Sequence, residues 1–114
     1  MATYEDATVL MQLLQWGATS GLEDALRRVF DPEFAVSPDP DAVGGDPAIG
    51  VALTFFETAG ALVKHGVLDI DLLYDTYWIA GVWSRVSNYA LAIRARSGEP
   101  RLYENFEALA RYSG

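Results

Sequence analysis

Hydrophobic residues recur along most of the chain at the three- and four-residue spacings of an amphipathic helix. No stretch of alternating apolar and polar residues is long enough to predict a strand. A chain of 114 residues can bury one hydrophobic core. The pattern therefore predicts an all-α protein, a compact bundle of four or five helices that forms a single domain over residues 1–114.

The N-terminal part of the chain contains two signals for the start of a helix. Thr3 and Asp6 have the spacing of a capping box and predict a first helix, which Gly17 would end. Ser20 and Glu23 repeat that spacing and predict the start of a second helix. The pattern leaves open whether these are two helices or one helix with a kink.

Residues 31–46 are rich in Pro, Gly and Asp and contain no basic residue, which predicts an acidic loop. Asp46 and Pro47 then have the character of an N-cap and a first helical residue. The helix that they begin should run to Lys64 and end at Gly66.

The next helical pattern is long for a domain of this size. It runs from Asp69, a suitable N-cap, to Arg96, and 28 residues would span about 42 Å as one helix. We therefore expect either a bend, with Gly81 as its position, or one end that projects past the bundle. Pro100 should begin a last, short helix.

Charge and cysteine content exclude several classes of function. The formal net charge is −8, with −8 carried by residues 1–57 and +2 by residues 76–114. An acidic surface disfavours binding to phosphates, so we expect no nucleic-acid partner. Cysteine is absent, which excludes disulfides, thiolate catalysis and sulfur-ligated metals.

The composition also bears on location and source. The first ten residues lack the pattern of a signal peptide, and the apolar stretch at 51–63 is shorter than the roughly 20 residues of a membrane helix. We expect a soluble cytoplasmic protein without a membrane partner. Seven arginines against one lysine, with abundant Ala, Gly, Asp and Val, indicate a bacterial source of high GC content.

The sequence offers little for a metal or cofactor. His65 is the single histidine, and its position fits neither a di-iron bundle nor a zinc site. Asp39, Asp41 and Gly44 match positions one, three and six of a calcium loop, but positions five and twelve lack oxygen ligands. We interpret this segment as a solvated acidic turn and expect no cofactor.

Glu57 stands alone among apolar residues in the segment ALTFFETAGALVKHG. A buried carboxylate is costly unless it is paired, and Arg85 and Arg94 of the following helix are suitable partners. A structural ion pair is our preferred interpretation. The alternative is a catalytic role for Glu57, or for His65 as a general base.

Three aromatic residues of the long helical pattern, Tyr74, Trp78 and Tyr89, lie partly off its apolar face. Such residues are typical of protein interfaces, although capping the ends of the bundle explains them equally well. Gly60 and Gly81 lie inside predicted helices, where glycine is unfavourable, and we expect close helix packing at each.

Several segments together resemble a known family. They are LTFFETAGALVKHGVLDIDLLY, GVWSRV, AIRARSG and LYENFEALARY, and the likeness extends best over residues 47–112. They are similar to the domain of unknown function 4760 family, a group of small helical bacterial proteins. The resemblance implies an all-α fold but no activity, and it assigns no catalytic residue.

Three hypotheses for function follow, in order of preference. The first is a non-catalytic protein-interaction module that self-associates, with Tyr74, Trp78, Tyr89 and the acidic loop at 31–46 as contacts. The second is a bundle that binds a small apolar ligand, with Glu57 and an arginine as its polar groups. The third is an enzyme of unrecognised type that uses Glu57 or His65.

Overall fold

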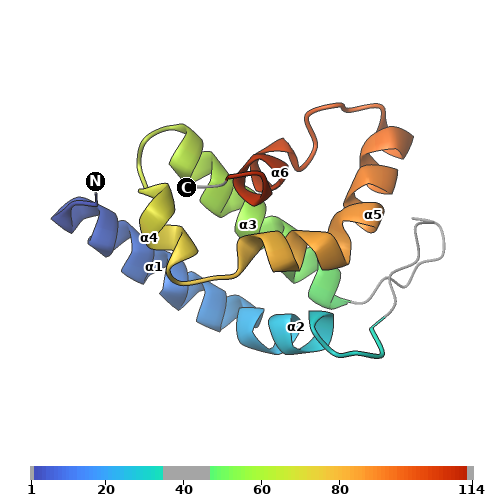
Figure 1. Ribbon diagram of the computed structural model, residues 1–114, viewed down its shortest axis with the longest axis horizontal. Coiled ribbons are helices and arrows are strands. Elements are labelled where there is room, and N and C mark those ends of the chain that lie inside the picture. The colour runs from blue at the N-terminus through green and yellow to red at the C-terminus, as the bar shows by residue number, and fades with distance from the viewer. Residues whose placement is uncertain (1, 35–46, 113–114) are drawn as a thin grey trace.

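A computed structural model describes residues 2–34 and 47–112, which form six helices and no strand (Figure 1). The helices are α1 (Tyr4–Ser20), α2 (Leu22–Val29), α3 (Pro47–Lys64), α4 (Ile70–Tyr74), α5 (Ile79–Ser97) and α6 (Glu104–Ala110). The prediction of an all-α protein is confirmed. The described part of the chain has more helices than expected because the long helical pattern divides into α4 and α5.

Helix α1 begins with the predicted capping box. The Asp6 carboxylate accepts hydrogen bonds from the Thr3 backbone N–H and hydroxyl at 2.8 and 2.9 Å, and the Asp6 N–H donates to the Thr3 hydroxyl. The prediction that α1 ends at Gly17 is wrong, because the helix continues to Ser20 and is capped by Gly21, which has a φ of 84°. Gly17 is a packing residue, since a Cβ there would lie 2.9 Å from Phe55 Cε2.

The second predicted capping box does not form. The N-cap of α2 is Gly21, which provides no side-chain hydrogen bond, and the Ser20 hydroxyl instead donates to the Gly17 carbonyl. The left-handed conformation of Gly21 separates α1 from α2 and resolves the question of one helix or two. Figure 1 shows the two helices following one another along the lower edge of the molecule.

Helix α3 is the central element and contacts α1, α2, α5 and α6. Pro47 is its first residue, and the chain leaves the helix through Gly66, whose φ is 74°, so the predicted end is confirmed. Asp46, the calcium-like residues Asp39, Asp41 and Gly44, and all but the first four residues of the predicted loop at 31–46 lie outside the described residues. The core residues that α3 contributes are Ala48, Ile49, Ala52, Leu53, Phe55, Phe56 and Ala59.

Helix α3 is also long and apolar enough to cross a membrane by length and composition alone. It has 18 residues with a mean hydropathy of 1.2, and 44% of that span is buried inside the structure. The central helix of a compact domain meets the same criterion, and the contacts of α3 with four other helices give it that position here.

The predicted bend occurs as a break before Gly81. Residues 75–78 leave the helical path between α4 and α5, and Asp69 caps α4 as expected by accepting from the Leu72 N–H at 3.0 Å. The break lets the Tyr77 ring meet Phe55 and Phe56 edge-on, at centroid distances of 5.6 and 5.4 Å. Aromatic packing in the core therefore accounts for where the chain bends.

The C-terminal segment folds over the end of α3 and α5. Helix α5 ends at Ser97 and is capped by Gly98, and α6 begins at Glu104 instead of near Pro100, after Tyr103 adopts a φ of 61°. Phe106 is fully buried, and its ring contacts Phe56 at 5.1 Å. Burying one such side chain contributes about 1.5–3 kcal/mol, and Leu109, the other buried residue of α6, adds to the attachment of this helix to the core.

Gly60 and Gly81, the two glycines predicted inside helices, are packed against different neighbours. A Cβ at Gly60 would lie 2.6 Å from the Asn105 carbonyl oxygen, so the predicted close approach of two helices, α3 and α6, is confirmed. At Gly81 a Cβ would lie 2.3 Å from Cδ2 of Trp78. The expectation of helix packing is wrong there, because an indole ring occupies the space over the glycine.

Candidate functional site

The carboxylate of Glu57 is engaged through both oxygens. Oε1 accepts from the Phe106 backbone N–H at 3.0 Å, and Oε2 accepts from the Asn105 side-chain amide at 2.8 Å. Phe106 is the third residue of α6, and the backbone N–H at this position has no acceptor within the helix. The side chain of Tyr103, the N-cap residue, does not accept a hydrogen bond from it. Glu57 of α3 thus caps α6 from a neighbouring helix.

The partners of Glu57 differ from the two arginines predicted for it. Arg85 donates to three backbone carbonyls, those of Val29, Asp31 and Phe34, at 2.9, 2.9 and 3.2 Å. These carbonyls lie at and after the C-terminal end of α2, where the helix leaves acceptors unpaired. Arg85 therefore holds the end of α2 and the chain that follows it against α5.

Arg94 lies near the C-terminal end of α5 and binds the segment that follows this helix. Its Nη1 forms an ion pair with Glu107 Oε1 at 3.1 Å, and its Nε donates to the Leu102 carbonyl at 2.8 Å. Both charged side chains are 18% exposed. The pairing expected between Arg94 and Glu57 is replaced by one with Glu107, which the sequence analysis did not propose as a partner of Arg94.

His65 follows the last residue of α3 and is exposed. Its backbone N–H donates to the Ala61 carbonyl at 3.1 Å and extends the end of the helix. Within residues 2–34 and 47–112, no three His, Asp or Glu side chains are grouped to hold a metal ion. The other titratable residues considered in the sequence analysis, Glu57, Arg85 and Arg94, make the hydrogen bonds described above with other described residues and not with His65.

Trp78 is the exposed member of the three aromatic residues predicted for an interface. Its side chain is 72% exposed, and its ring stacks on Phe30 with a centroid distance of 5.7 Å and an interplanar angle of 3°. Phe30 is 39% exposed and follows the last residue of α2. We call Phe30 and Trp78 the aromatic pair; it joins the end of α2 to the start of α5.

The other two aromatic residues have different positions. Tyr74 is half-buried, its hydroxyl donates to the Leu109 carbonyl, and burial raises the pKa of that hydroxyl. Tyr89 is half-buried against the core. Sequence reasoning did not single out Phe30, which comes directly after the last residue of α2 and stacks on Trp78.

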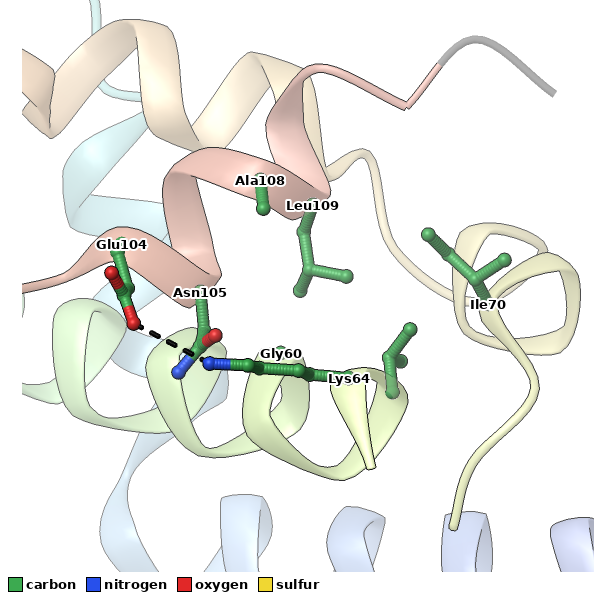
Figure 2. A pocket seen from close by; sticks show the side chains of 8 residues that line it. Gly60, Lys64, Ile70, Glu104, Asn105, Ala108 and Leu109 are labelled. Atoms are coloured by element: carbon green, nitrogen blue, oxygen red, sulfur yellow. Dashed lines mark ion pairs between the residues drawn. The ribbon is translucent and has the colours of Figure 1, made fainter. Parts of the chain in front are cut away.

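A groove opens on the surface between α3, α6 and the short helix α4 (Figure 2). Its volume is about 440 Å³, and its lining residues are Gly60, Val63, Lys64, Ile70, Glu104, Asn105, Ala108 and Leu109. Figure 2 shows Ile70 and Leu109 pointing into the same space beside α3. We call this feature the α3–α6 groove.

One end of the α3–α6 groove is charged. Lys64 Nζ lies 3.5 Å from Glu104 Oε1, whereas Arg101 Nε lies 3.0 Å from the same oxygen. The hydrogen bond from Arg101 is the main reason that the pKa of Glu104 lies below its ordinary value of 4.5. Glu57 does not line this groove and no arginine does, so it differs from the pocket expected from the sequence.

Comparisons with known proteins identify the family but no characterised relative. Neither a curated protein nor a solved structure gives a significant match to the chain. The model of one family, described as a domain of unknown function (DUF4760), matches residues 8–113. That match includes α2 to α6 and most of α1, and it agrees with the resemblance noted from the sequence. The chain therefore belongs to the DUF4760 family of domains of unknown function.

Proposed function

We propose that this protein is a non-catalytic interaction module that self-associates through the aromatic pair of Phe30 and Trp78. The observation that carries the proposal is the exposure of Trp78, whose side chain is 72% exposed although it is held by a ring stack. Tryptophan is the residue most enriched among those that dominate binding energy at protein interfaces.

The aromatic pair is held in place before any partner arrives. Phe30 lies flat against one ring face of Trp78, and the missing Cβ of Gly81 makes room for the indole on α5. A side chain that is already ordered loses less conformational entropy on binding. This arrangement favours a role as an anchor over that of an incidental surface residue.

The charges near Phe30 favour a second copy of this chain as the partner. Arg27 and Arg28 precede Phe30, and Asp31 and Glu33 follow it, so residues 27–33 carry both signs of charge. In a twofold dimer the same surface faces itself, and a patch of one sign would repel its copy. A mixed segment can meet its copy without that repulsion.

A catalytic alternative finds less support. Both oxygens of Glu57 are engaged in holding α6, so a catalytic role would require the carboxylate to act while it also keeps the Phe106 N–H and the Asn105 amide bonded. His65 is exposed at the end of α3. A general base needs a substrate proton within hydrogen-bond reach, and the two donors that the described residues place on the Glu57 carboxylate, the Phe106 N–H and the Asn105 amide, belong to the structure of α6.

Sedimentation velocity over a range of protein concentrations tests the proposal. The wild-type protein should show a reversible increase in mass with concentration, and Trp78→Ala should weaken association tenfold or more, or about 1.4 kcal/mol. Tyr4→Ala is the matched control, because Tyr4 is 86% exposed at the start of α1. It should associate as the wild type does.

Two results would overturn the proposal. One is a wild-type protein that stays monomeric at the highest concentration. The other is a Trp78→Ala variant that associates as strongly as the wild type, which would move the interface elsewhere. Circular dichroism of each variant confirms that the fold is retained, and Phe30→Ala provides a second, independent change in the same pair.

A further inference from the structure

The α3–α6 groove has the size and lining of a small-molecule site. Its volume of about 440 Å³ lies within the range of roughly 300–1,000 Å³ that ligand pockets occupy. Its walls are mainly apolar, formed by Val63 of α3, Ile70 of α4, and Ala108 and Leu109 of α6. Three separate helices thus converge on one apolar space.

The polar residues of the groove lie together at one end. Figure 2 shows the ion pair of Lys64 and Glu104 to one side of Ile70 and Leu109. A molecule bound in this groove would meet apolar side chains along its length and charged side chains at its end. That arrangement fits an amphipathic ligand with a tail and a head.

Lys64 is the charged group available to such a head. Its side chain is 48% exposed, and its distance of 3.5 Å from Glu104 exceeds that of a strong charge-assisted hydrogen bond. Glu104 has a second, closer cation in Arg101 at 3.0 Å. If Lys64 turned to an incoming anion, Glu104 would keep a partner.

We propose that the α3–α6 groove binds an amphipathic carboxylate, with its apolar tail along Val63, Ile70 and Leu109 and its carboxylate on Lys64 Nζ. The charge complementarity at Lys64 selects the anionic head, and the apolar walls select the tail. This site uses none of the residues of the aromatic pair, so it goes beyond the proposed self-association and stands independently of it.

The probe is sodium decanoate, added below its micelle concentration to ¹⁵N-labelled protein and followed by NMR. Saturable shifts should concentrate on the amides of Val63, Lys64, Ile70, Ala108 and Leu109. Decanol, which has the same tail without the charge, should bind about two- to fivefold more weakly, the difference expected of one partly exposed ion pair. Hexanoate should bind more weakly than decanoate because it buries fewer methylenes.

Lys64→Met isolates the head, because it retains an unbranched apolar stem without the ammonium. It should bind decanoate about two- to fivefold more weakly and lose the preference for decanoate over decanol. Arg27→Gln is the matched control. It removes one positive charge from an exposed position on α2, outside the lining of the groove, and should bind decanoate as the wild type does.

Ala108→Phe isolates the tail. Ala108 is exposed on α6 and lines the groove, so a larger side chain there should fill the space without disturbing the core. Both decanoate and decanol should lose most of their affinity. Circular dichroism monitors the fold, and Lys64→Met keeps the proposal testable if Ala108→Phe does not fold.

Several outcomes would overturn the proposal. Decanoate shifts that centre on Trp78, or that persist in Ala108→Phe, would place binding elsewhere. Equal affinity for decanoate and decanol in the wild type would remove the role of Lys64. Groove amides that shift with protein concentration alone, and no longer respond to decanoate, would show that a second copy of the chain covers the groove instead.

Discussion

Glu57 and Phe106, 49 residues apart in the chain, are joined by a hydrogen bond of 3.0 Å from the Phe106 N–H to the Glu57 carboxylate. The bond serves an N–H in the first turn of α6, which lacks a partner within the helix. Capping normally comes from a side chain just before the helix, but Tyr103 holds that position with a φ of 61° and no side-chain cap. Glu57 performs the task from α3.

Removing this cap should destabilise the protein. Glu57→Ala leaves the Phe106 N–H and the Asn105 amide without their acceptor, and we expect the free energy of unfolding to fall by about 2–3 kcal/mol. Glu57→Gln keeps one acceptor oxygen and should lose about 1 kcal/mol. Urea denaturation followed by circular dichroism measures both changes.

Glu23→Gln is the control for this experiment. Glu23 forms an ion pair with Arg27 on the surface of α2, and its side chain is 79% exposed. A change at such a site should stay within about 0.5 kcal/mol. If Glu57→Ala cost no more than Glu23→Gln, the carboxylate of Glu57 would not hold α6.

Asp6 should make stability depend on pH. Hydrogen bonds from Thr3 chiefly lower the pKa of Asp6 below its ordinary value of 3.8, and the backbone N–H of Asp69 adds to this effect. A depressed pKa in the folded state stabilises the protein above the unfolded pKa, and this contribution is lost as pH falls through the folded value. The stability difference between wild type and Asp6→Asn should therefore be largest above about pH 5 and shrink below pH 3.8.

NMR titration of the Asp6 carboxyl carbon checks the same point directly. The pKa should lie below 3.8 in the wild type and rise toward that value in Thr3→Ala, which removes the hydroxyl part of the capping box. A wild-type pKa at or above 3.8 would contradict the prediction. It would mean that the hydrogen bonds to Asp6 do not outweigh its burial.

Local chemistry predicted the parts of the fold that depend on neighbours in the chain. The capping box at Thr3 and Asp6, the cap at Asp69 and the helix end at Gly66 all follow from residues within one turn of each other. The errors arose where tertiary packing decides the result. A glycine at position 17 suggested the end of a helix, yet this glycine lies inside α1, where the absence of a Cβ leaves space for the ring of Phe55.

The interactions of Glu57 show the same limit at the candidate site. Its isolation among apolar residues predicted a carboxylate that needs a partner, and charge pairing suggested an arginine. The partners in the structure are a backbone N–H and an amide, and the N–H of Phe106 in the first turn of α6 needs such an acceptor because Tyr103 at the N-cap offers no side-chain cap. Sequence alone gives no signal for an acceptor supplied by another helix.

Two glycines of α3 should respond in opposite ways to alanine. At Gly50 a Cβ meets no atom within 4 Å, so Gly50→Ala should stabilise the protein by about 0.5–1 kcal/mol through helix propensity. At Gly60 a Cβ would lie 2.6 Å from the backbone oxygen of Asn105, which cannot turn aside. Gly60→Ala should therefore destabilise by about 1–3 kcal/mol despite the same gain in propensity.

Thermal or urea unfolding of the two variants distinguishes these cases, and Gly50→Ala is the control for helix propensity within the same helix. Stabilisation by Gly60→Ala would contradict the close approach of α3 and α6. It would also weaken the description of the groove, since Gly60 and Asn105 both line it.

Gly81 and Trp78 should be energetically coupled. A Cβ at position 81 would lie 2.3 Å from Trp78 Cδ2, so Gly81→Ala must move the indole and disturb its stack on Phe30, a contact worth about 0.5–1.5 kcal/mol. The gain in helix propensity, about 1 kcal/mol, should nearly cancel that loss in the wild-type background. In Trp78→Ala the obstacle is absent, and Gly81→Ala should stabilise by about 1 kcal/mol.

A double-mutant cycle of unfolding free energies measures this coupling, which should be about 1 kcal/mol or more. The same variants separate stability from association. Gly81→Ala keeps the indole but displaces it, so it should weaken self-association in the direction of Trp78→Ala while leaving the fold nearly as stable as before. Normal association in Gly81→Ala, with the coupling energy confirmed, would show that the interface needs the indole ring but not its position over Phe30.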